Sequence, residues 1–160
     1  TIEKVNSWDY QTVDDPFSGA QTSVVRAITP DVTLLHCQFV DASGNCGYLG
    51  APFLDPTLAR AATVCIVQAE QYVEELPPTC DSILPGYLID AYCVLEGGAH
   101  PASSHGCYSY DDPHIADYVA AAASAEGFAQ YRDEVIGVSE DAYRASVNIC
   151  ERLVALERKL

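Results

Sequence analysis

Short apolar runs separated by turn residues fill the first two thirds of the chain. Residues 24–28 and 32–40 are rich in β-branched and other apolar side chains, and both predict strands. The run 32–40 is almost continuously apolar, which is typical of a strand buried on both faces of a parallel sheet. Residues 63–67 and 87–95 predict two further strands, and Gly97 and Gly98 end the second of them.

Helical signals follow the second strand and dominate the last third of the chain. Asp55-Pro56 and Asp112-Pro113 each place a capping residue directly before a proline suited to the first helical turn. Residues 71–75 suggest a single helical turn. Ser124 and Ser139 are candidate caps of two further helices. The last of these has an apolar stripe formed by Ile149, Leu153, Leu156 and Leu160.

The order of these elements predicts an α/β fold. We expect an open, mainly parallel sheet with helical crossovers and a helical C-terminal tail. Residues 1–20 are polar and turn-rich, and predict an irregular N-terminal segment. Residues 21–111 would form the α/β sheet core, and residues 112–160 the helical tail of the same domain. A length of 160 residues suits one domain or one lobe of a larger fold.

Charge and cysteine content narrow the class of protein. Eight basic and 23 acidic residues give a net charge of −15, which argues against nucleic-acid binding and against anionic membranes. We find neither an apolar run of about 18 residues nor a signal-peptide pattern at the first residues. The seven cysteines are odd in number and show no C-x-x-C spacing, so free thiols in a reducing cytoplasm are expected.

The densest cluster of polar side chains follows the predicted strand 87–95, at residues 97–114, and contains three of the four histidines. Ligands of α/β folds bind beyond the carboxyl ends of strands, so this segment is either a substrate-lining loop or an ordered loop with histidines bonded to backbone. Its candidate substrate-binding residues are Gly97, Gly98, Ala99, His100, Ser103 and Ser104. A metal site built from His100, His105, Cys107 and His114 matches no standard spacing, and we expect no metal.

A second candidate group follows the run 32–40. His36 lies late in that run, where a histidine is either a hydrogen-bonded core residue or a base. Asp41, Gly44 and Asn45 have the chemistry of a turn near the site. Glu70 follows the strand 63–67 and could be a general base or could cap the next turn. His36, Glu70 and His100 are therefore weak catalytic candidates, and the catalytic residue stays unassigned.

Several segments together resemble a known family. They are residues 84–91, 97–101 and 106–111, His36 after Pro30-Asp31-Val32, and the Asp41, Gly44, Asn45 turn. This combination resembles the α subunit of family I CoA-transferases, with the glutaconate CoA-transferase type most similar. The resemblance runs from about Asp15 to Val147 and corresponds to the carboxy-terminal half of such a chain. Glu96, where relatives often have proline, and His105 depart from the family pattern.

The resemblance implies an enzyme that moves CoA between an acyl-CoA and a carboxylic acid. The active site would lie between α-type and β-type subunits, and the nucleophilic glutamate would belong to the β-type chain. The implied partners are an amino-terminal α-type piece and a β-type subunit. Coenzyme A would be a thioester substrate, with no tightly bound cofactor.

Two alternatives remain open from the sequence. The same fold could hydrolyse a CoA ester, including ring opening, with water in place of the glutamate. The chain could also be a non-catalytic structural or binding subunit. Because CoA carries phosphates and this chain is strongly acidic, we expect most contacts with the CoA phosphates to come from partner chains.

Overall fold

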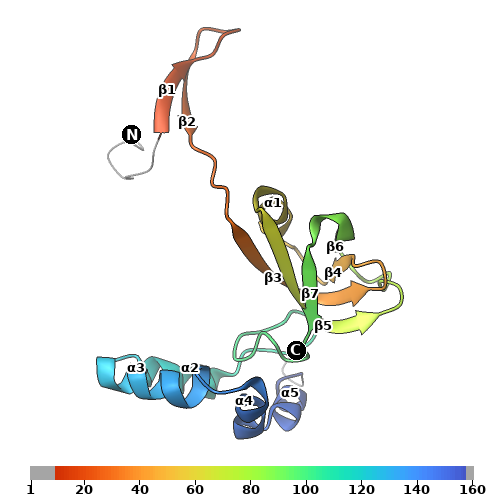
Figure 1. Cartoon of the computed structure of the whole chain (residues 1–160), viewed down its shortest axis with the longest axis vertical. Helices are drawn as coiled ribbons and strands as arrows, with labels where there is room; N and C mark the ends of the chain where they lie inside the picture. Colours follow the sequence, from red (N-terminus) through yellow and green to blue (C-terminus); the bar gives the residue numbers. More distant parts are fainter. Residues whose placement is uncertain (1–9, 158–160) are drawn as a thin grey trace.

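A five-stranded mixed sheet forms the centre of the chain in the computed structural model, which describes residues 10–157 (Figure 1). The strand order is β6-β4-β3-β5-β7. Strands β3 (Val32–Asp41), β5 (Val64–Val73) and β7 (Ala91–Val94) run parallel to one another. Strands β4 (Cys46–Tyr48) and β6 (Ser82–Leu84) add an antiparallel edge that the sequence analysis did not predict. The expected α/β class with a mainly parallel sheet is confirmed.

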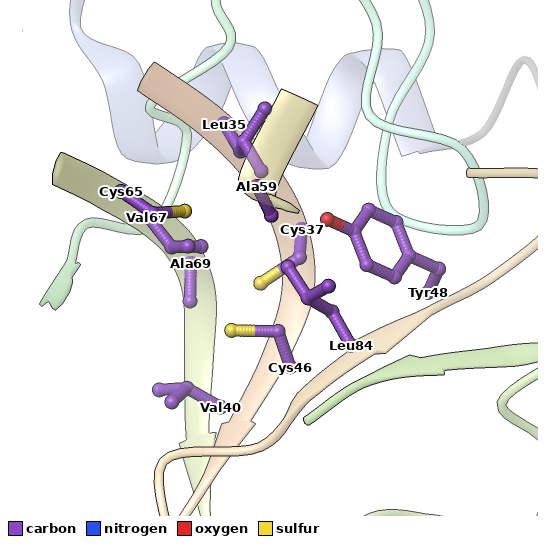
Figure 2. Close-up of a cluster of buried hydrophobic side chains, with 10 residues drawn as sticks. All are labelled: Leu35, Cys37, Val40, Cys46, Tyr48, Ala59, Cys65, Val67, Ala69 and Leu84. Carbon is purple, nitrogen blue, oxygen red and sulfur yellow. The ribbon is translucent and has the colours of Figure 1, made fainter. Parts of the chain in front are cut away.

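One face of the sheet carries the hydrophobic core. Helix α1 (Asp55–Ala61) covers this face, and its Ala59 packs among side chains from β3, β4, β5 and β6. Figure 2 shows how these side chains converge. The cluster consists of Leu35, Cys37, Val40, Cys46, Tyr48, Ala59, Cys65, Val67, Ala69 and Leu84. Its three cysteines are free thiols, so they act as small apolar residues here.

A hairpin precedes the sheet and projects away from it (Figure 1). Its strands are β1 (Tyr10–Asp14) and β2 (Gln21–Val25), paired antiparallel. The Asp15 carboxylate shapes the turn, because it accepts hydrogen bonds from the Phe17 N–H and the Ser18 hydroxyl. The prediction that residues 1–20 are irregular is therefore wrong for residues 10–14, which form β1, whereas residues 16–18 form a turn as expected. Residues 1–9 lie outside the described chain.

Several predicted element boundaries are corrected by long-range pairing. Strand β5 continues to Val73, because Gln71 and Tyr72 pair with Phe39 and Val40 of β3, so the helical turn predicted at 71–75 is wrong. The strand predicted at 87–95 is shorter, since η2 (Gly86–Leu88) is a 3-10 turn that precedes β7.

The caps of the first two helices are also corrected. The N-cap of α1 is Leu54, so Asp55 lies inside the helix. Asp111 caps α2 (Asp112–Ala121), and its carboxylate accepts a hydrogen bond from the His114 N–H. In both helices the aspartate before the proline lies in the first turn. There its negative charge is stabilised by the positive, N-terminal end of the helix dipole.

The C-terminal region is helical, as predicted. The last predicted helix, which begins after Ser139, is divided into two helices in the structure. The elements are α3 (Ala125–Tyr131), a π-helical turn η3 (Arg132–Ile136), α4 (Glu140–Val147) and α5 (Ile149–Glu157). The caps Ser124 and Ser139 are confirmed, since their hydroxyls accept hydrogen bonds from backbone N–H groups. Asn148, in a left-handed conformation with φ 50°, separates α4 from α5.

The apolar stripe predicted in this region belongs to α5. Ile149, Leu153 and Leu156 are buried against Tyr108, so the helical tail packs on the loop that follows β7. Leu160, the fourth member of the predicted stripe, lies outside the described residues. Within residues 10–157, no helix is both long enough and apolar enough to cross a membrane.

A substitution at Gly86 tests how tightly η2 packs against the turn after β3. A Cβ atom at Gly86 would lie 2.5 Å from the Ser43 carbonyl oxygen and 2.9 Å from the Gly44 carbonyl carbon. We therefore expect Gly86→Ala to lower the free energy of unfolding by about 1–3 kcal/mol, because rigid backbone must move. Denaturant unfolding measures this, with Ser43→Ala as the control in the same turn. Equal unfolding midpoints for the two variants would contradict the expected clash.

Candidate functional site

A cavity of about 750 Å³ lies at the carboxyl ends of the parallel strands. Strands β3, β5 and β7 form one wall, the loop of residues 96–108 forms a second and α5 forms a third. This is the position at which α/β sheets place ligands. The cavity therefore agrees in position with the predicted substrate-lining loop.

Glu70 is the buried carboxylate of this cavity, with a relative exposure of 6%. Its oxygens accept hydrogen bonds from the Gly97 N–H at 2.6 Å and from the Tyr108 hydroxyl at 2.6 Å. The His36 Nε2 atom lies 3.1 Å from Glu70 Oε1. Burial raises the pKa of Glu70, but the bonds from His36, Tyr108 and Gly97 outweigh burial and hold this pKa below its usual value. Glu70 is therefore an ionised carboxylate that joins the sheet to the loop.

His36 faces Glu70 from the neighbouring strand. Its Nδ1 atom lies 2.6 Å from the Gln68 side-chain oxygen, and its Nε2 atom lies 3.2 Å from the Ser104 hydroxyl. Burial lowers the pKa of His36, but hydrogen bonds to Glu70 and Gln68 outweigh burial and raise this pKa above its usual value. The imidazolium form is thus favoured, with acceptors at both ring nitrogens.

The loop after β7 is held against these side chains by its backbone. The Tyr108 hydroxyl donates to Glu70 and accepts the Ala99 N–H at 2.9 Å. Gly98 lies against the side-chain amide of Gln68, where a Cβ atom would overlap that amide. Ser104 is buried, and its backbone pairs with that of Tyr108.

The structure separates the predicted site residues into one group around Glu70 and a second group around His100. His36, Glu70, Gly97, Gly98, Ala99 and Ser104 lie together, and Ser103 precedes Ser104 in the same loop with a half-buried side chain.

His100 belongs to a second polar network. Its Nε2 atom lies 2.9 Å from an Asp111 carboxylate oxygen, and its Nδ1 atom lies 2.6 Å from the Tyr143 hydroxyl. Arg152 of α5 donates to both Asp111 oxygens, at 2.8 and 2.5 Å. Burial raises the pKa of Asp111, but Arg152 and His100 outweigh burial and hold this pKa far below its usual value. Both ring nitrogens of His100 are engaged, which favours a structural role.

His114 completes this network and brings three potential metal ligands together. The ligand atoms of His100, Asp111 and His114 lie within 4.8 Å of one another. A cation there would have to displace the guanidinium of Arg152, which already binds the Asp111 carboxylate. Among the described residues, His114 therefore groups with His100 and Asp111, and not with His105 and Cys107 as the metal alternative required.

Asp41, Gly44 and Asn45 form the turn between β3 and β4. The Asp41 carboxylate accepts hydrogen bonds from the N–H groups of Ser43 and Asn45, and the Asn45 side-chain oxygen accepts the Gly86 N–H at 2.9 Å. Gly44 and Gly86 line a separate cavity of about 440 Å³. These contacts agree with the turn-shaping role that the sequence favoured.

Two residues of the hydrogen-bond network around Glu70 and His36 were missed by sequence reasoning. Tyr108 is 2% exposed and bridges Glu70 to Ala99, yet an isolated tyrosine in a polar segment gives no local signal of burial. Gln68 contacts His36 and donates to the Leu95 carbonyl, so it joins β3 to the end of β7. Only the register of β3 against β5 brings Gln68 opposite His36.

Comparison with known proteins finds related chains of CoA-transferases. This chain is 32% identical to the A subunit of 3-oxoadipate CoA-transferase from Pseudomonas knackmussii over 151 residues, which are 94% of this chain and 53% of the relative. It is 32% identical to the A subunit of glutaconate CoA-transferase from Acidaminococcus fermentans over 133 residues, which are 80% of this chain and 41% of the relative. The chain thus spans about half the length of these relatives. No family profile matches it.

Solved structures show the same fold. Glutaconate CoA-transferase from Acidaminococcus fermentans matches with a TM-score of 0.79 and 28% identity, covering 92% of this chain and 48% of the matched chain. A variant of the decarboxylase AibA/AibB matches with a TM-score of 0.70 and 33% identity, covering 82% of this chain and 48% of the matched chain. The resemblance to the CoA-transferase α chain is therefore confirmed.

Replacing Glu70 by glutamine tests the link between sheet and loop. We expect Glu70→Gln to lower the free energy of unfolding by about 1–3 kcal/mol, because an amide oxygen cannot accept all the hydrogen bonds of the carboxylate. Denaturant unfolding measures this, and Glu74→Gln, at an exposed position in the same segment, is the control. A Glu70 variant as stable as the control would contradict a joining role.

The same variant changes the pH dependence. The folded pKa of His36 is raised, so its contribution to stability is full below the unfolded value of about 6.5 and is lost as pH rises through the folded pKa. In Glu70→Gln the charge beside His36 is removed, so an NMR titration should give a lower pKa for His36. The free energy of unfolding of this variant should therefore decline less than that of the wild type as pH rises above about 6.5. An unchanged His36 pKa would show that Glu70 does not act on this ring.

Proposed function

The chain is homologous to the A subunits of CoA-transferases over most of its length, and on that basis we propose that it forms part of the α-type chain of a CoA-transferase. The enzyme would move CoA from an acyl-CoA to a carboxylic acid in the cytoplasm. The observation that carries this proposal is the agreement with these relatives in both sequence and fold. Because the chain spans about half of their length, its partners would be a β-type subunit, together with the amino-terminal piece of the α-type chain.

The cavity beside Glu70 would receive the acyl group or the acceptor acid. Its position at the carboxyl ends of the parallel strands supports this, together with the loop of residues 96–108 that lines it. The nucleophilic glutamate would come from the β-type partner and would carry CoA as a glutamyl thioester. CoA would be a substrate, and its phosphates would contact mainly partner chains.

The residues of this chain would position the loop. Glu70 accepts hydrogen bonds from Gly97 and Tyr108, and these bonds reduce its nucleophilicity. His36 stabilises the Glu70 charge from the next strand. We therefore assign Glu70 and His36 as positioning residues for the cavity wall.

A specific observation favours a second candidate reaction. One structural relative is the decarboxylase AibA/AibB, and its identity to this chain is similar to that of the CoA-transferase relatives. The fold therefore accommodates more than one type of reaction. Decarboxylation is thus the second candidate for the assembled enzyme.

The test uses the complex purified untagged from its source, with its subunits identified by native mass spectrometry. The complex is incubated with an acyl-CoA and a ¹³C-labelled carboxylic acid. The proposal predicts label in the CoA ester and a partner-chain thioester that borohydride reduces. Release of CO₂ would instead indicate decarboxylation, and free acid formed without an acceptor would indicate hydrolysis. Absence of all three reactions would leave a non-catalytic role for the chain.

A further inference from the structure

We propose that the cavity beside Glu70 selects acyl groups that lack a second carboxylate. This inference rests on the proposed function, because it names the substrate class of the same cavity. The inference predicts a substrate class that differs from the acids named for the relatives above, since 3-oxoadipate and glutaconate are both dicarboxylic acids.

Three carboxylates line the cavity from three different elements. Glu70 comes from β5, Glu96 begins the loop after β7, and Glu157 ends α5. No lysine or arginine lines the cavity in the part of the chain that the structure describes. The His36 imidazolium balances the charge of Glu70, so a ligand carboxylate here would meet two further like charges, those of Glu96 and Glu157.

The fields of these carboxylates converge on one side chain. The Cys107 thiol lines the cavity, and its pKa is raised by burial and then by the charges of Glu70, Glu157 and Glu96, against one hydrogen bond with Ser104 that lowers it. The same fields that disfavour a thiolate at Cys107 disfavour any other anion at that place.

The arginines near the cavity are already engaged. Arg144 donates to the backbone carbonyl of Glu96 at 2.6 Å and lies 3.7 Å from the Glu140 carboxylate. Arg152 binds Asp111 through two hydrogen bonds. His36 is directed to Glu70 and Gln68. Around this cavity, the described residues therefore supply no uncommitted positive group for a second ligand carboxylate.

The remaining walls suit an uncharged chain. Phe39, Leu49, Val94 and Leu153 present apolar side chains to the cavity. An alkyl or alkenyl tail can bury apolar surface against these side chains. A tail ending in a carboxylate would lose hydration there and be repelled by the glutamates. One like charge about 8 Å away in a water-like medium weakens binding about two- to threefold, so Glu96 and Glu157 together would weaken it about four- to ninefold.

The test compares pentanoyl-CoA with glutaryl-CoA, which differ at the end of the tail by a methyl group against a carboxylate. The probe protein is the purified complex, and the readout is the ratio of kcat/KM for the two esters. We expect the wild-type complex to favour pentanoyl-CoA by at least about fourfold. The double variant Glu96→Gln, Glu157→Gln should reduce this ratio about four- to ninefold, mainly by improving glutaryl-CoA. Glu134→Gln, an exposed glutamate outside the cavity, should leave the ratio unchanged.

Two results would overturn the inference: equal or better use of glutaryl-CoA by the wild type, or a ratio that the double variant does not change. Failure of the proposed function gives a different result, namely no CoA exchange with either ester. In that case the dissociation constants of the two esters, measured by calorimetry on the same complex and variants, decide the selectivity by the same criteria.

Discussion

The candidate site depends on one buried carboxylate. A charged group inside a protein is tolerated only when hydrogen-bond donors surround it, and Glu70 obtains its donors from two separate parts of the chain. His36 approaches from the neighbouring strand, while the Gly97 N–H and the Tyr108 hydroxyl come from the loop after β7. The buried carboxylate needs the donors of the loop, and this need holds the loop against the sheet. The cavity has a fixed wall as a result.

A second ion pair fixes the residues that follow the same loop. Arg152 of α5 binds Asp111, which also contacts His100 and caps α2. Leu153, next to Arg152, packs on the loop beside Tyr108 and also lines the cavity. The C-terminal helix is thus part of the cavity wall, and its position depends on the Asp111 charge. The two networks together place His36, His100 and Arg152 against the buried carboxylates of a predominantly acidic chain.

Local patterns allowed part of this structure to be predicted. The apolar run 32–40 indicated a parallel strand, which β3 is, but the prediction that it is buried is only partly right, since Val32 and Leu34 are exposed. Ser124 and Ser139 act as caps through hydrogen bonds to residues three positions away. Strands β4 and β6 have three residues each, too few for a periodic pattern. The partners of His100 could not be predicted, because Asp111 and Tyr143 lie 11 and 43 positions further along the chain, at the start of α2 and in α4.

The central claim is that the loop anchored by Glu70 forms a wall of the acyl-CoA site. Hydrogen–deuterium exchange on the purified complex, with and without pentanoyl-CoA, tests this claim most directly. The account predicts that peptides covering residues 96–108 exchange more slowly when the ester is bound, because the ligand contacts and stabilises the loop. Unchanged exchange in this loop, with slower exchange only in segments away from the cavity, would contradict it.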